Sequence, residues 1–264
     1  MSSNSHCRSA TIALALLAVG AYAGSATPAA DAHPDLTGIW TWDTDINKGA
    51  GRFILVWPDA PPLTKEGHDK VEAYKALVAP RGESPSSYCL GMGMPGSTLA
   101  SGGYPMEVIQ RPEQVTIIQE AHSELRRIFI NQPPIPDSDL FPTRNGYSTG
   151  RWEGDTLVVD TTALEESFDQ GSAHSELAHV VERFRLGRDT KGRKILTDEL
   201  TLTDPRFYTQ PVTVTKTWIA MKKGGRMLDY DCNEPAWQDH LEQLARQAAK
   251  AAVTPKGAAP ASKP

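Results

Sequence analysis

Short segments with alternating polar and apolar positions occupy most of the chain from Met106 onward. Many of their apolar positions hold β-branched residues, and this alternation is the period of a strand with one buried face. Turn sequences rich in Gly, Pro and charged residues separate the segments. With a short strand opening at Gly38, they predict an all-β fold, either an antiparallel barrel or a sandwich. The segments read MEVIQ, QVTIIQEA, ELRRIFIN, DTLVVDTT, HVVERFRL, KILTDELTLTD, VTVTKTWIAM and MLDYDC.

Two segments have helical spacing instead. Two prolines lead into Thr64, which can cap a helix, and apolar residues then recur at helical spacing until Pro80. This pattern predicts a helix over about 64–79. An apolar stripe predicts a second, C-terminal helix over 235–252.

Two long connections lack a periodic pattern. The one between Arg81 and Pro105 is rich in Gly, Ser, Pro and Met, which predicts a long ordered loop. The other, 132–146, contains four prolines. We expect it to lie across an opening of the barrel, where it would serve as a lid.

The first 23 residues have the organisation of a secretory signal peptide. A polar start with Arg8 is followed by an apolar run and small residues, so we predict cleavage after Ala23, with a cut after Ala32 as the alternative. The apolar run is too short for a permanent membrane span, and no later segment is long enough. We therefore expect an exported, periplasmic protein without stable membrane insertion. The rest divides into a spacer (24–35), a barrel domain (36–234), the C-terminal helix and a disordered tail (253–264) that is poor in large apolar residues.

Charge and cysteine content narrow the picture further. A formal net charge of −5 and the lack of a long basic run exclude the electrostatic footprint of a nucleic-acid-binding protein. Cys7 lies in the signal, which leaves Cys89 and Cys232. In an oxidising compartment an even pair predicts a disulfide; the alternative is two buried thiols that never meet.

The first candidate for chemistry is Asp160 in DTLVVDTT. It shares a strand face with Val158, which favours a partly polar interior cavity over solvent. The alternative is a structural carboxylate held by Arg or backbone donors. Just upstream, Arg151 and Trp152 are expected to bind substrate. The alternative is that Arg151 to Asp155 form only a hairpin turn, in which Trp152 plugs the end of the barrel and Gly154 supplies a positive φ.

The second candidate is His179 in AHSELAHVVERFR. The spacing from His174 to His179 matches no firm zinc pattern, so we expect no metal. A strand that begins at His179 places His179 on one face and Glu182 on the other. His179 would serve as acid or base, because imidazole titrates near neutral pH; a histidine bonded within the sheet is the alternative.

A third cluster surrounds the two arginines of QEAHSELRRIF. Adjacent strand residues point to opposite faces, so either Arg126 or Arg127 should enter the interior and pair with Glu120 or Asp160. The alternative is an exposed, salt-bridged hairpin. The sequence has no G-x-S-x-G elbow, no phosphate-binding loop and no G-x-G-x-x-G after a strand, so we expect no cofactor.

With these motifs in view, the chain resembles a large group of exported bacterial hypothetical proteins. The resemblance spans most of the mature chain, and GRWEGDTLVVDTT is its most specific part. The group's turn commonly reads GHS, and Tyr147 stands here in place of that His. The group carries no established function, so the resemblance implies none. Its other motifs are DLTGIW, the Cys89–Pro95 loop, EVIQRPEQVTII, RRIF, HVVERF, LTDP and DYDCNE.

A weaker resemblance, carried by Gly38-x-Trp40 on the first strand, is to lipocalin and calycin barrels. It implies an antiparallel barrel around one small apolar ligand.

These observations predict a cofactor-independent enzyme that acts on a small apolar or aromatic metabolite by proton transfer, as a lyase, isomerase, hydratase or hydrolase. One alternative is a lipocalin-like periplasmic binding protein. Another is an envelope protein whose proline-rich loop and C-terminal helix contact a partner. For the enzyme, the expected catalytic residues are Asp160, His179, Tyr147 and Glu120, and the expected substrate-binding residues are Arg126, Arg127, Arg151 and Trp152.

Overall fold

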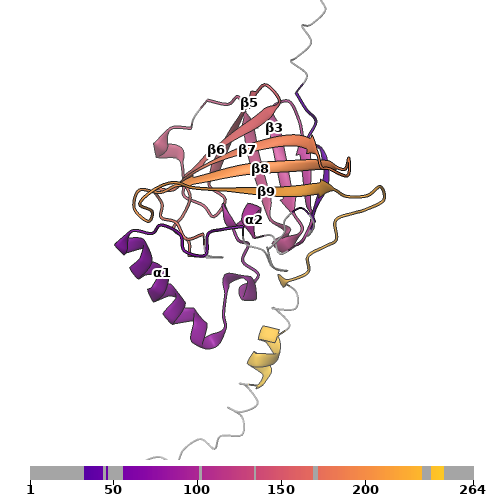
Figure 1. The fold of residues 1–264 in the computed structure, drawn as a ribbon. Coiled ribbons are helices and arrows are strands. Elements are labelled where there is room, and N and C mark those ends of the chain that lie inside the picture. The colour runs from indigo at the N-terminus through magenta and orange to yellow at the C-terminus, as the bar shows by residue number, and fades with distance from the viewer. Residues whose placement is uncertain are drawn as a thin grey trace, which may run out of the picture. The chain divides into compact units, whose positions relative to one another are not determined.

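The computed structural model contains a closed barrel of nine strands, in which β1 (Gly38–Trp42) pairs with both β2 (Met106–Gln110) and β9 (Val212–Ala220). The predicted all-β barrel is confirmed and the sandwich is wrong, because the sheet closes on itself. Figure 1 shows β5 to β9 side by side in one wall. The other strands are β3 (Gln114–Gln119), β4 (Leu125–Ile130), β5 (Tyr147–Glu153), β6 (Thr156–Thr162), β7 (His179–Arg188) and β8 (Lys194–Thr203).

Several predicted segments lie outside what the structure describes. These are the signal peptide, most of the spacer and the C-terminal tail. Of the predicted C-terminal helix, residues 239–246 are helical, and the remainder of 235–252 lies outside the described part. The structure describes residues 33–43, 46, 56–100, 103–133, 135–168, 172–233 and 239–246.

Side chains alternate strictly between the inside and the outside of the barrel. Along β6 and β7 the inward positions include Leu157, Val159 and Phe184, as the strand period requires. A large apolar side chain that is fully buried in this way contributes about 1.5–3 kcal/mol. The apolar part of the interior is filled by Leu36, Trp40, Met106, Val108, Val115, Ile117, Ile128, Ile130, Leu157, Val159, Phe184, Leu196 and Trp218.

One strand pair departs from the predicted antiparallel pattern. β4 and β5 run parallel and share only three register pairs, from Ile128 opposite Ser148 to Ile130 opposite Gly150. The cause is the long proline-rich connection, which carries the chain back to the end of the barrel where β4 began. All the other neighbouring strands are antiparallel.

Two strand predictions were wrong. The run before Gly154 is not only a turn, because β5 occupies Tyr147–Glu153. Its inward positions hold Ser, Gly and Trp, which hides the apolar alternation. Gly150 is small because a Cβ there would lie 2.8 Å from Cδ1 of Ile130 and 2.9 Å from Cγ2 of Ile128. The segment MLDYDC forms no strand, since the closed barrel leaves no free edge for it.

The predicted early helix is confirmed as α1 (Lys65–Val78). The Thr64 hydroxyl accepts a hydrogen bond from the Gly67 amide at 3.1 Å and donates to the Arg206 carbonyl at 2.6 Å. A Cβ on Gly67 would lie 2.6 Å from the Phe207 carbonyl oxygen. The first turn of α1 therefore packs directly on the backbone of the turn after β8.

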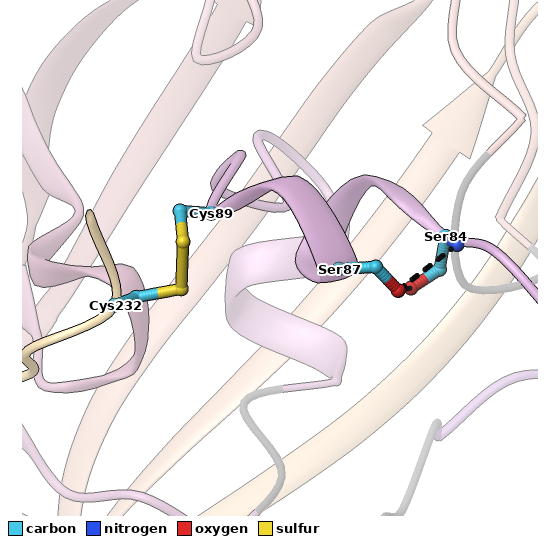
Figure 2. The surroundings of a disulfide bond; sticks show 4 residues. All are labelled: Ser84, Ser87, Cys89 and Cys232. Atoms are coloured by element: carbon cyan, nitrogen blue, oxygen red, sulfur yellow. Dashed lines mark hydrogen bonds between the residues drawn. A yellow bond between two sulfur atoms is a disulfide. The ribbon is translucent and has the colours of Figure 1, made fainter. Parts of the chain in front are cut away.

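The predicted disulfide is also confirmed. Cys89 and Cys232 are bonded, with their Cα atoms 5.6 Å apart (Figure 2). Cys89 follows a short 3₁₀ turn in which the hydroxyls of Ser84 and Ser87 lie 3.2 Å apart. The bond joins the segment that leads into α2 (Gly96–Leu99) to the segment after β9, across a sequence separation of 143. In the chain-entropy model, a disulfide that closes a loop of this length stabilises the fold by about 5 kcal/mol, because it restricts the unfolded chain.

Gly150 gives a direct test of the packing between β4 and β5. We expect Gly150→Val to lower the free energy of unfolding by about 1–3 kcal/mol, because the new methyl groups would overpack Ile128 and Ile130. The measurement is urea unfolding followed by tryptophan fluorescence.

Gly187 provides the matched control on β7. Its Cβ would make only ordinary contacts, the closest being 3.5 Å from Cγ1 of Ile195. Gly187→Val should therefore change stability by less than about 1 kcal/mol. Equal losses from the two variants would contradict the packing account.

Candidate functional site

A cavity of about 750 Å³ lies between α1, the segment before it and the loop after β6. The apolar wall consists of Trp57, Leu63, Val71 and Phe168. The same side chains pack against a second hydrophobic core, which consists of Met94, Leu99, Leu164, Ala173, Ala178, Val180, Leu200, Leu202, Phe207, Tyr208 and Val212. The volume falls within the range of sites that hold small organic ligands.

Charged side chains of α1 surround this cavity. Lys65 and Lys75 are held in ion pairs along the helix, Lys65 with Asp69 at 2.5 Å and Lys75 with Glu72 at 2.9 Å. His68 also lines the cavity. The cavity thus combines an aromatic and aliphatic wall with a polar rim, an arrangement that suits an apolar molecule with one polar end.

A second site, made of buried polar side chains, lies inside the barrel next to α2. Arg126 on β4 and Glu182 on β7 form a buried ion pair there, with their side chains 5% and 0% exposed. Arg126 also donates to the hydroxyls of Ser148 at 3.1 Å and Thr161 at 2.8 Å. The Thr98 hydroxyl of α2 donates to Glu182 at 3.3 Å.

Lys216 on β9 and Asp198 on β8 lie opposite each other beside this ion pair. The Lys216 ammonium donates to the Thr98 carbonyl at 2.6 Å and lies 5.4 Å and 5.2 Å from the ring centres of Trp42 and Trp218. Glu182 and Lys216 thus hold α2 from two sides, one through the Thr98 hydroxyl and the other through its carbonyl.

Burial shifts the titration of both groups toward their neutral forms. It raises the pKa of Asp198 well above its usual range, and the nearby charge of Glu182 raises it further. Burial lowers the pKa of Lys216 to about 7, while Asp198 acts in the opposite sense. An acid and an amine whose pKa shifts both favour the neutral form therefore lie on adjacent strands inside the barrel.

Asp160 and His179 meet on the outer face of the barrel. His179 Nε2 lies 3.2 Å from Asp160 Oδ1, and Arg151 donates to Asp160 Oδ2 at 2.6 Å. The Asp160 side chain is 33% exposed, so the expectation of an interior Asp160 is wrong. The physical reason is that Val158 lies between Arg151 and Arg183 in the sheet register, and their aliphatic stems can cover it from outside.

Of the other predicted residues, Arg126, Arg127 and Tyr147 line one small cavity, whereas Glu120 and Trp152 lie elsewhere. As expected, one arginine points inward; it is Arg126, but its partner is Glu182 and neither Glu120 nor Asp160. Arg127 faces outward and is exposed. Glu120 accepts a hydrogen bond from the Leu228 amide at 2.6 Å, away from the other candidates.

The two aromatic candidates, Tyr147 and Trp152, each stack on another ring. Tyr147 stacks on Phe129 with ring centres 5.4 Å apart and lines a small outer cavity of about 220 Å³. Trp152 stacks on His33 and packs against the barrel core, which agrees with the alternative of a plug at the barrel end. The eight expected residues therefore do not converge on one interior site.

Asp198 and Lys216 were not among the predicted site residues, although the sequence carries a signal for both. In KILTDELTLTD, Asp198 is flanked two residues away on each side by Leu196 and Leu200, and all three side chains are buried. Lys216 likewise stands two residues before the buried Trp218. A charged residue in the apolar phase of an alternating strand marks the interior, and that criterion would have found them.

Comparison with protein-family models, curated protein sequences and solved structures found no match to the chain. The likeness to the exported bacterial group therefore stays a prediction. Among the described residues, no cluster of three or more His, Cys, Asp or Glu side chains could hold a metal ion. No helix in the described part is both long and apolar enough to span a membrane.

The shifted pKa of Lys216 predicts a pH dependence of stability. The unfolded chain keeps this amine protonated up to its ordinary pKa of 10.5, whereas the folded protein releases the proton near pH 7. Lys216 should therefore contribute a rise in stability with pH above 7, by at most about 1.4 kcal/mol per pH unit, while the raised pKa of Asp198 contributes in the opposite sense. Urea unfolding measured from pH 7 to 9.5 tests this. The pH range ends at 9.5 because burial raises the pKa of Tyr208, so that above pH 10, the ordinary pKa of tyrosine, the unfolded chain loses a proton that the folded protein keeps and stability falls.

Lys216→Met is the matching variant. It keeps an unbranched side chain but removes the titrating group, so this part of the rise should disappear. The same pH slope in wild type and variant would show that Lys216 does not release its proton in this range.

Proposed function

We propose that the protein binds a small apolar or aromatic molecule in the 750 Å³ cavity beside α1. The cavity is the single observation that carries this proposal, because its size and its aromatic wall suit such a ligand. Trp57 and Phe168 would contact the apolar body of the ligand, and the polar rim of α1 would face its polar end.

The compartment we propose is the periplasm. The first 23 residues have the pattern of a signal peptide, and the Cys89–Cys232 disulfide is typical of an oxidising compartment. A binding protein in this compartment would carry or sequester the ligand without a cofactor.

The binding test uses a neutral aromatic probe, N-phenyl-1-naphthylamine, whose fluorescence rises in apolar surroundings. We expect saturable binding to the wild type and a loss of at least about tenfold in affinity for Val71→Trp, because the indole would fill the cavity. Titration at constant protein concentration gives both affinities.

Leu77→Trp on the same helix is the control. Leu77 is 66% exposed and does not line the cavity, so the added indole should leave binding unchanged. Equal affinity for wild type and Val71→Trp would place the probe elsewhere and overturn the proposal.

A second candidate function is the acid–base enzyme expected from the sequence. The contact between Asp160 and His179 favours it, since a carboxylate can orient an imidazole for proton transfer. Arg151, which bonds Asp160, also lines an outer cavity of about 380 Å³ together with Gln132 and Pro133 from the proline-rich connection. A substrate in that cavity would lie beside the pair.

This candidate predicts that Asp160→Asn lowers turnover by about 100-fold or more, because the amide would no longer support an imidazolium at His179. The measurement is mass spectrometry of a metabolite extract incubated with each protein. Glu153→Gln is the control, since Glu153 pairs with Arg151 and Arg183 but not with His179. No depletion by the wild type, or equal depletion by Asp160→Asn, would reject the enzyme at this position.

A further inference from the structure

Lys216 has the surroundings of a reactive amine. Its side chain lies between two indole rings inside the barrel, with 2% of the residue exposed. Asp198 lies directly across from it on the neighbouring strand. Desolvation in an apolar pocket is one way in which proteins keep a lysine neutral and nucleophilic.

The partner of this amine is a carbonyl group of the chain itself. Lys216 Nζ donates to the main-chain oxygen of Thr98 at 2.6 Å. Thr98 belongs to α2, a helix of only four residues whose side chains are all buried. The short helix thus holds a carbonyl at the place where a carbonyl ligand would meet the amine.

We propose that Lys216 forms a Schiff base with a small aldehyde or ketone that takes the place of the Thr98 carbonyl beneath α2. The site is separate from the cavity beside α1, and the inference does not depend on ligand binding there. It also does not involve Asp160 or His179.

The reaction balances with the groups present. The lone pair of the neutral amine attacks the carbonyl carbon, the C–N bond forms, and the carbonyl oxygen takes a proton from the Asp198 carboxyl group. The nitrogen then gives a proton back to Asp198. A second proton transfer from Asp198 lets the hydroxyl leave as water while the nitrogen lone pair forms the C=N bond, and the resulting iminium keeps its charge beside the Asp198 carboxylate. The net change is one imine formed and one water released.

The test traps the iminium with propanal and sodium cyanoborohydride at pH 7, using the folded full chain. Hydride transfer to the iminium carbon leaves a propyl group on the amine, which blocks tryptic cleavage after Lys216 and yields the joined peptide Phe207–Lys222. We expect Lys216 to react at least about ten times faster than Lys65, whose side chain is 90% exposed. The reason is that about half of Lys216 is neutral at pH 7, whereas an ordinary lysine is almost fully protonated.

Thr98→Val is the informative variant. It removes the hydroxyl that donates to Glu182 and so loosens α2, while Lys216 and Asp198 stay in place. Trapping at Lys216 should become faster in this variant, with the rate at Lys65 unchanged. Lys216→Met assigns the peptide, since it cannot be propylated at that position. If Lys65 is propylated and Lys216 stays unmodified in both the wild type and Thr98→Val, the Schiff-base proposal is overturned.

Discussion

The buried ion pair between Arg126 and Glu182 ties together four consecutive strands of the barrel, including the parallel pair β4 and β5. β4 and β5 share three register pairs, as few as β1 shares with each of its neighbours, and the Arg126 guanidinium bridges β4 and β5 by donating to Ser148. The same guanidinium reaches Thr161 on β6 and Glu182 on β7. Removal of one partner from a buried pair costs about 3–5 kcal/mol, because the other charge is left without compensation. The alignment of β4 to β7 therefore depends on this pair.

The other buried polar groups of the barrel interior are linked to this ion pair through Glu182. The charge of Glu182 adds to the burial that raises the pKa of Asp198, and Asp198 in turn lies opposite Lys216. Glu182 and Lys216 together hold Thr98 and with it α2. Burial thus shifts the pKa values of an amine and an acid on adjacent strands toward their neutral forms, and the neutral form of an amine is the one that attacks a carbonyl group.

Strand alternation was enough to predict an all-β barrel or sandwich and which residues of β6 and β7 share a face, and helical spacing after Thr64 predicted α1. It could not predict whether a face is inside or outside, because Val158 is buried on the outer face between two arginines. It also missed β5, whose inward glycine is dictated by Ile128 and Ile130 from another strand. The cavity beside α1 was not predictable for a related reason. Its wall joins segments that are about a hundred residues apart, and local periodicity carries no information about such contacts.

The short helix α2 contributes to the barrel site and packs against side chains that line the cavity beside α1. Leu99 packs in the second core with Trp57 and Phe168, which line the cavity, while Thr98 beside it bonds to Glu182 and Lys216 in the barrel. Close-packed interiors do not deform continuously, so α2 cannot shift on one side without repacking on the other. A ligand in the cavity and a ligand at Lys216 would influence each other only to the extent that each prefers a different position of α2. Leu99 and Thr98 therefore make α2 a direct structural link between the two sites.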